Sequence, residues 1–118
     1  MPADPGVIRL FHAHVYYTEA SRPRAADLRS ALGARFAVTL GRWHDQPIGP
    51  HSRGMYQVAF PPEAFADLLP WLMLNRDGLD ILVHPETGDE VADHTAHALW
   101  LGERLPLRLE ALAPGVPT

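Results

Sequence analysis

The sequence predicts an α+β fold in which an antiparallel sheet carries two helices on one of its faces. Segments with alternating apolar residues, which are typical of strands, are separated by two segments with apolar residues at helical spacing. Their order along the chain is strand, helix, strand, strand, helix, strand. A chain of 118 residues with 47% hydrophobic content is expected to form a single domain over residues 1–118 with its own core.

Residues 8–17 alternate in polarity and predict the first strand. One face of this strand would be apolar, whereas the other would carry His12, His14 and Tyr16. A first helix is expected next, because Ser21 can cap it and the apolar residues at positions 25, 28 and 32 have helical spacing. We expect Gly33 to end this helix after about three turns.

Residues 36–40 and 55–60 predict the second and third strands, with a long loop between them at residues 41–54. A loop of this length inside a small domain is usually functional. A second helix begins at residues 61–63 and has an apolar stripe at positions 65, 68, 69 and 72. We expect Pro70 to kink this helix or to divide it.

Residues 79–84 predict a fourth strand, which completes a ferredoxin-like βαββαβ sheet with both helices on one face. The remaining chain would cover part of the other face with a short helix around residues 93–101 and an edge strand in which Leu105, Leu107 and Leu109 alternate. A homodimer would cover the rest, because a small sheet with a bare face exposes more apolar surface than a monomer usually tolerates.

The composition excludes several classes of protein. A net charge of −4 without a basic face argues against nucleic-acid binding. All ten basic residues are arginine, which excludes Schiff-base and lysine-anchored pyridoxal phosphate chemistry, and the absence of cysteine excludes thiol nucleophiles, disulfides and thiolate metal sites. The start of the chain lacks the features of a signal peptide, and no window approaches the roughly 20 apolar residues that span a bilayer. We therefore expect a cytoplasmic protein without a membrane partner, in which imidazole and oxygen hold any metal.

Four imidazoles are predicted to converge on the helix-free face of the sheet. The first strand would be central, so His12 and His14 project from the middle of that face. His84 shares the face because Ile81 and Val83 take the core side of its strand, and His51 enters from the long loop. Neutral imidazole is a common ligand for zinc and iron, so the pattern indicates a metal site. The alternatives are chance alternation on the first strand and a turn in which His84 bonds only to the backbone.

Other residues are candidates for catalysis and substrate binding. His94 and His97 lie on one side of a helix if Asp93 caps it, and would be ligands, general bases, groups that position a ligand, or simply a polar helix face. His44 stands in a polar loop and is expected to be solvated.

Two arginines bracket the long loop and are candidates for binding a substrate carboxylate. A planar guanidinium is the usual partner for such a group, although Arg42 and Arg53 would serve equally in surface ion pairs. Tyr16 and Tyr56, together with two tryptophans, could form the wall of an aromatic substrate pocket, and each is also typical of a core.

Several segments resemble the DOPA 4,5-dioxygenase family, in its small fungal and bacterial type. They are Phe-His-Ala-His-Val-Tyr-Tyr at 11–17, Ile-Gly-Pro-His at 48–51, Pro-Trp-Leu at 70–72, Leu-Val-His-Pro-Glu-Thr-Gly-Asp at 82–89, and Asp-His-Thr at 93–95 with Leu-Trp-Leu-Gly at 99–102. The match runs in order over about residues 8–109.

The resemblance implies a ferredoxin-like, usually dimeric protein that performs extradiol cleavage of a catechol such as 3,4-dihydroxyphenylalanine (DOPA) with dioxygen at a non-haem metal. Fe(II) is the implied metal, and zinc is an alternative in a purified sample. By correspondence the metal role falls to His12, His14, His51 and His84, and the acid/base role falls to His94.

Extradiol enzymes commonly use two histidines and one carboxylate, so the resemblance also leaves four carboxylates as candidate oxygen donors: Glu86, Asp89, Glu90 and Asp93. Three functions stay open at this point. They are a catechol dioxygenase, another metal-dependent enzyme such as an isomerase or hydrolase, and a non-catalytic dimer that binds a metal or a small molecule.

Overall fold

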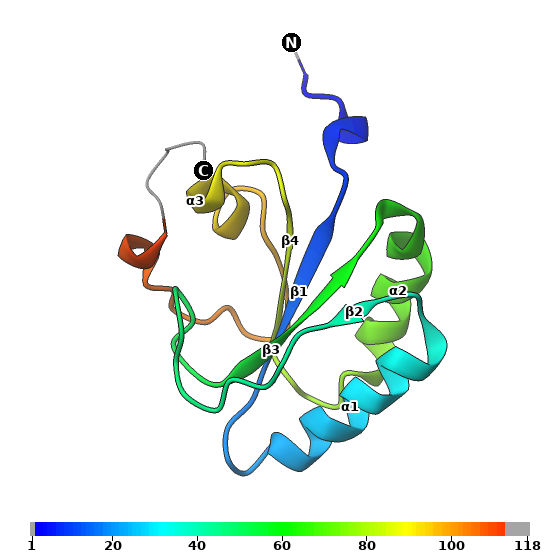
Figure 1. Cartoon of the computed structure of the whole chain (residues 1–118), viewed down its shortest axis with the longest axis vertical. Coiled ribbons are helices and arrows are strands. Elements are labelled where there is room, and N and C mark those ends of the chain that lie inside the picture. The colour runs from blue at the N-terminus through cyan, green and yellow to red at the C-terminus, as the bar shows by residue number, and fades with distance from the viewer. Residues whose placement is uncertain (1, 113–118) are drawn as a thin grey trace.

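The computed structural model describes residues 2–112 and forms one five-stranded antiparallel sheet with the strand order β2-β3-β1-β4-β5 (Figure 1). The strands are β1 (Phe11–Tyr16), β2 (Thr39–Leu40), β3 (Met55–Phe60), β4 (Ile81–Pro85) and β5 (Leu99–Leu101). The helices are α1 (Arg22–Arg35), α2 (Pro62–Asn75) and α3 (Glu90–His94), with 3-10 turns at Pro5–Val7 and Leu109–Ala111. The predicted α+β class and the βαββαβ order are confirmed.

Both long helices pack on the same face of the sheet (Figure 1). Val15, Val58 and Ile81 project from the three central strands into this layer, where Leu32 of α1 and Leu72 of α2 meet them. All five side chains are almost fully buried. The alternation along each strand therefore leaves the other face of the sheet for residues of the opposite parity.

Helix α1 does not end at Gly33 but continues to Arg35. Phe36 adopts extended backbone after it and packs its side chain against the core, which ends the helix. At Gly33 the helix passes close to β2. A Cβ atom placed at this glycine would lie only 3.1 Å from Leu40 Cδ1. Ser21 does not cap the helix through its side chain, because its hydroxyl accepts a hydrogen bond from the backbone N–H of Thr18 at 2.8 Å.

Pro70 does not divide the second helix, which runs unbroken to Asn75. Proline removes one backbone hydrogen bond from a helix interior. Leu68 and Leu69 before it and Leu72 after it are all buried in the core. Their packing on both sides of Pro70 offsets the missing bond.

The chain after β4 differs most from the prediction. Asp89 rather than Asp93 caps α3, because its side chain accepts a hydrogen bond from the N–H of Ala92, and the helix therefore begins and ends earlier than expected. The edge strand is β5, which pairs with β4, whereas the segment with Leu105 and Leu107 crosses the helix-free face. No helix in the described part of the chain is long and apolar enough to cross a membrane.

Replacing Leu32 by Ala should lower the free energy of unfolding by about 2–5 kcal/mol, because a fully buried leucine leaves a cavity between α1 and the sheet. Urea unfolding followed by circular dichroism measures the change. The matched control is Leu74→Ala at a position that is 85% exposed, where the change should stay within about 0.5 kcal/mol. Equal effects of the two substitutions would contradict the packing described here.

Candidate metal centre

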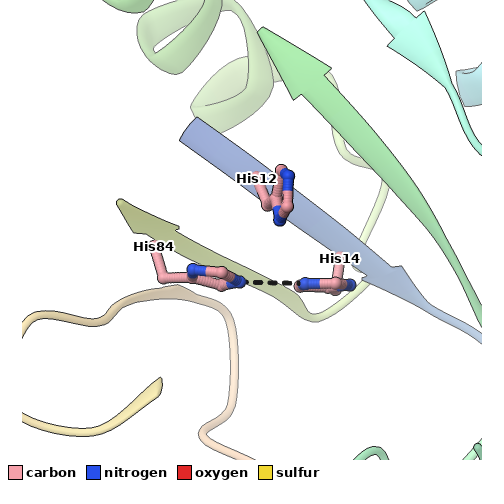
Figure 2. A group of neighbouring side chains, drawn as sticks. All are labelled: His12, His14 and His84. Atoms are coloured by element: carbon pink, nitrogen blue, oxygen red, sulfur yellow. Dashed lines mark hydrogen bonds between the residues drawn. The ribbon is translucent and has the colours of Figure 1, made fainter. Parts of the chain in front are cut away.

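The antiparallel pairing of β1 with β4 brings three histidines to the helix-free face. His12 lies directly opposite His84, and His14 lies opposite Leu82 on the same face. The three imidazoles each offer a ring nitrogen, and these nitrogens all lie within 4.8 Å of one another. Figure 2 shows His14 and His84 pointing toward each other with His12 beside them.

The contact between His14 and His84 joins two Nε2 atoms at 3.0 Å. The Nδ1 of His84 lies 2.8 Å from the carbonyl oxygen of Pro85 and must carry the proton, because a carbonyl can only accept. Nε2 of His84 therefore presents its lone pair to His14. His14 itself is buried, and its Nδ1 has no hydrogen-bond partner among the described residues. Each neutral tautomer of His14 leaves a buried ring nitrogen unsatisfied.

A divalent metal fits this set of donors. If Nε2 of His14 is unprotonated, two lone pairs face each other at 3.0 Å, an arrangement that a cation between them makes favourable. Neutral imidazole nitrogen is a preferred ligand of Zn(II) and Fe(II). His12, His14 and His84 are therefore the residues that could hold the metal.

Glu86 orients the ring of His12. Its Oε1 lies 2.8 Å from Nδ1 of His12, where the carboxylate favours a proton on that nitrogen and so leaves the lone pair on Nε2 of His12. Burial and the nearby His94 lower the pKa of His12, and burial, Asp93 and Glu90 raise the pKa of Glu86. A carboxylate bonded to the rear nitrogen of a ligating histidine is a recurring feature of metal sites, because it fixes the tautomer and the ring orientation.

Two further rings complete an imidazole cluster, which consists of His12, His14, His51, His84 and His94. The ring centroid of His51 lies 4.3 Å from that of His14, and the centroid of His94 lies 4.2 Å from that of His84. Nδ1 of His94 donates to the carbonyl oxygen of Glu90 at 2.7 Å, so its Nε2 carries the lone pair.

Tyr16 projects from β1 on the same face as His12 and His14 and contacts His51. Its hydroxyl is hydrogen-bonded to Nδ1 of His51 at 2.6 Å. When the tyrosine oxygen is the acceptor, Nε2 of His51 is free to bind a metal. Burial raises the pKa of Tyr16, so the phenol stays protonated at neutral pH.

His14, His51 and His84 are neutral at physiological pH. Burial and the neighbouring imidazoles hold the pKa of His14 well below its ordinary value. Burial, reinforced by His94 and His84, lowers the pKa of His51 to about 4. Burial likewise lowers the pKa of His84 to about 4, although its hydrogen bond to Pro85 opposes the shift. The neutral imidazole is the form that binds a metal.

The segment after β5 closes the site with apolar side chains. Leu105 packs with Tyr16, Met55 and Leu82 in a second small core on the helix-free face. Arg108 donates a hydrogen bond to the backbone oxygen of His51 at 3.0 Å and so ties this segment to the long loop. The sequence assigned Leu105 to an edge strand and gave no signal for Arg108.

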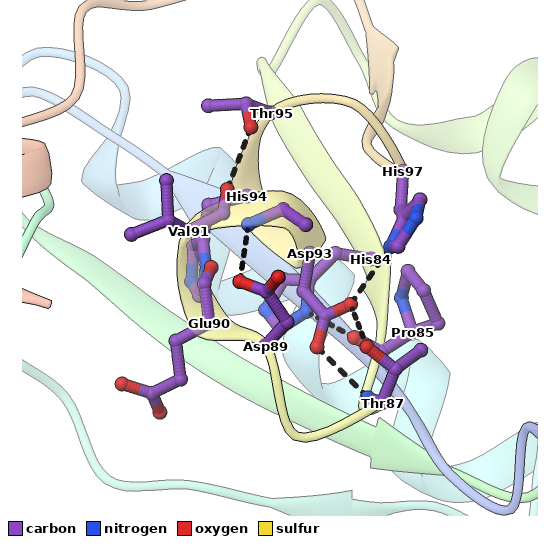
Figure 3. A network of polar contacts seen from close by, with 11 residues as sticks. His84, Pro85, Thr87, Asp89, Glu90, Val91, Asp93, His94, Thr95 and His97 are labelled. Carbon is purple, nitrogen blue, oxygen red and sulfur yellow. Dashed lines mark hydrogen bonds and ion pairs between the residues drawn. The ribbon is translucent and has the colours of Figure 1, made fainter. Parts of the chain in front are cut away.

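His97 lies outside the imidazole cluster and is about half exposed. Its Nδ1 donates to the buried carboxylate of Asp93 at 3.0 Å, and Asp93 also accepts from the N–H and hydroxyl of Thr87 (Figure 3). Burial opposes ionisation of Asp93, but these hydrogen bonds outweigh it and lower the pKa. Of the candidate oxygen donors, Asp89 and Asp93 are thus hydrogen-bonded to protein groups, and Glu86 lies 2.8 Å from Nδ1 of His12.

The candidate substrate-binding residues are dispersed. Tyr16 is in the site, whereas Tyr56 faces the helices, is fully buried, and donates its hydroxyl hydrogen to the carbonyl of Ala25. Tyr56 is a core residue because its position on β3 has the parity of the helix-covered face. Arg42 is exposed, and Arg53 lies 4.0 Å from Asp80 beside a separate cavity of about 430 Å³.

The model of the Dopa 4,5-dioxygenase family matches residues 11–111. The chain belongs to this family. The resemblance inferred from the sequence is therefore confirmed, and the histidines of the cluster all fall inside the matched region. Membership together with the histidine geometry supports a dioxygenase-family protein with a histidine site that could hold a metal.

Similar proteins come from fungi and a cyanobacterium. The DOPA 4,5-dioxygenase of Amanita muscaria is 39% identical over 114 residues, which cover 89% of this chain and 50% of that protein. An uncharacterized 21.2 kDa protein of Botryotinia fuckeliana is 38% identical over 120 residues, which cover 92% of this chain and 66% of that protein. The crystal structure of a Nostoc punctiforme protein described as a "putative dioxygenase" is 62% identical with a TM-score of 0.93, covering 94% of this chain and 96% of that one. The chain thus spans half to two thirds of the length of the two fungal relatives.

Glu86→Gln should weaken Zn(II) binding about tenfold, because a neutral amide loses the negative charge that lies 2.8 Å from Nδ1 of His12 and favours a proton on that nitrogen. Competition with a chromophoric chelator measures the dissociation constant. Glu63→Gln, at an exposed position on α2, is the control and should bind Zn(II) like the parent protein. Unchanged affinity in Glu86→Gln would show that this carboxylate does not position a ligand.

The metal-free protein should lose stability as the pH falls from about 6.5 to about 4. In this window the unfolded chain protonates its histidines, whereas His51 and His84 stay neutral in the folded state, so acid favours unfolding. Each such group contributes a slope of at most about 1.4 kcal/mol per pH unit. Urea unfolding across this range measures the slope, which should be smaller in His51→Gln. An identical slope in that variant would contradict the low pKa of His51.

Proposed function

We propose that the protein is a metal-dependent extradiol dioxygenase that opens the ring of a catechol such as DOPA with dioxygen. The observation that carries this proposal is the buried approach of the Nε2 atoms of His14 and His84 at 3.0 Å, with His12 beside them, in a member of the Dopa 4,5-dioxygenase family. Family membership supplies the reaction class, and the donor set supplies a place for the metal that this chemistry needs.

His12, His14 and His84 are the proposed ligands, and His51 is the proposed fourth. Fe(II) supplies, when bound, a Lewis acid that lowers the pKa of the catechol hydroxyls and offers dioxygen a binding position. Zn(II) would bind the same imidazoles without supporting the redox chemistry, so a purified sample that holds zinc would be inactive. The chain contributes neutral rings. The Pro85 carbonyl fixes the orientation of His84 through a hydrogen bond, and the Glu86 carboxylate lies beside Nδ1 of His12.

His94 is the proposed acid/base residue. Its Nδ1 proton is bound to the Glu90 carbonyl, so the lone pair that would accept a catechol proton is on Nε2 of a ring whose centroid lies 4.2 Å from that of His84. The sequence also offered His97 as a catalytic candidate. Its hydrogen bond to Asp93 instead gives it a structural role beside α3. Leu82 and Leu105 exclude water on the neighbouring side, which strengthens the electrostatic interactions within the site.

A homodimer is also part of the proposal. The segment after β5 covers the β4 side of the helix-free face, whereas Thr39, Gln57 and Ala59 on the β2 and β3 side remain wholly or partly exposed. A second copy would cover this remaining half of the sheet. Light scattering after size exclusion would report the mass directly.

The test of function is oxygen uptake by protein loaded anaerobically with Fe(II) and then given DOPA, protocatechuate or caffeate. We expect oxygen consumption with a yellow product in the visible spectrum for at least one catechol. His94→Gln should bind the metal normally but lower kcat by about 100-fold or more, because general acid–base catalysis typically contributes that much. His44→Gln is the control, since His44 lies outside the cluster and its only described bonds are from its backbone.

Two results would overturn the assignment. Metal binding without oxygen uptake, together with hydrolysis or isomerisation of another substrate, would indicate a different class of metal-dependent enzyme. Binding of catechols without turnover by the Fe(II)-loaded protein would indicate a non-catalytic binding protein.

A further inference from the structure

A small cavity opens beside His94 on the imidazole side of the sheet. Its volume is about 160 Å³, and it lies between the end of α3, β5 and the segment that follows β5. Trp100 lies opposite Leu82 in the sheet register and therefore projects to the same face as the cluster. The cavity and the imidazole cluster thus share His94 as a common wall.

The lining of this cavity combines apolar side chains with three polar ones, of which Thr95 bonds its hydroxyl to the backbone oxygen of Val91. Trp100, Leu105 and Leu107 form apolar walls, His94 is the polar group on the cluster side, and Arg104 is the cation at the rim. Among the residues that the structure describes, Arg104 is the charged side chain other than histidine that lines this space. The cavity therefore fits a short apolar group that ends in an anion.

The guanidinium of Arg104 is available for a ligand. No ion pair or hydrogen bond joins it to any residue between 2 and 112, whereas Arg22 is paired with Asp45 and Arg24 bonds to Asp77. A carboxylate is the usual partner of an arginine fork. Arg108, the next arginine along this segment, already donates to the backbone oxygen of His51.

We infer that Arg104 is a specificity-determining residue, which binds the carboxylate on the side chain of the catechol substrate while the ring hydroxyls lie at the imidazole cluster. The inference rests on the proposed function. It assigns the role that the sequence suggested for Arg42 and Arg53 to a different arginine, because neither of those two lines this cavity.

The experiment compares two catechols that differ only in the carboxylate, 3-(3,4-dihydroxyphenyl)propionate and 4-ethylcatechol. Arg104→Gln in the Fe(II)-loaded protein should lower kcat/KM for the propionate about fivefold, mainly through KM, and leave 4-ethylcatechol within twofold. The effect is modest because Arg104 is exposed and its ion pair is partly screened. Arg104→Lys should recover part of the loss. Arg9→Gln removes the same charge at an exposed position outside the cavity and is the control.

Anaerobic calorimetry with the metal-loaded protein measures the same discrimination without turnover. Binding of the propionate should weaken in Arg104→Gln, while binding of 4-ethylcatechol should not. If wild-type protein binds both catechols but consumes no oxygen, the proposed function fails and the calorimetry still decides the role of Arg104. Equal losses for the two ligands, or no loss for the propionate, would overturn the inference whether or not the protein is active.

Discussion

The register between β1 and β4 is the constraint on which the site depends. It sets His12 directly opposite His84, and the two-residue period of the strand then places His14 on the same face. A shift by one residue would turn these rings into the layer beneath α1 and α2. The large apolar residues of the opposite parity, such as Val15 and Ile81, prevent that shift because they are fully buried there. The packing of the helices therefore fixes the geometry of a site on the other side of the sheet.

Grouping several imidazoles in a poorly solvated space is costly unless their protons and lone pairs are arranged. The Pro85 and Glu90 carbonyls each accept the Nδ1 proton of a histidine, His84 and His94, and the Glu86 carboxylate lies 2.8 Å from Nδ1 of His12. The lone pairs of these rings are then on Nε2. His14 lacks such a partner, and it is the ring whose Nε2 meets another Nε2. When His14 is unprotonated at Nε2, a cation within this group offsets the repulsion between the two lone pairs, so the hydrogen bonds that fix the tautomers also prepare the rings as ligands.

Alternation along the sequence was enough to predict the strands that carry His12 and His84, because burial on one face imposes a clear period. The sequence could not assign faces to β3, so it offered Tyr56 for the substrate pocket although that residue belongs to the core. It also named Asp93 as the helix cap, whereas the structure has Asp89 in that role, and both are acidic residues that suit a helix start. The partnership of Glu86 with His12 depends on the turn that follows β4, which no local pattern specifies.

The proposed metal ligands and the proposed specificity-determining residue lie in different parts of the chain. His12, His14 and His84 lie on paired strands, which hold their positions through backbone hydrogen bonds. Arg104 lies after β5 in a segment without a ladder of such bonds, where a substitution changes the rim of the cavity but not the register of the sheet. A change of substrate side chain therefore requires change in this segment alone, while the metal ligands stay where the two central strands hold them.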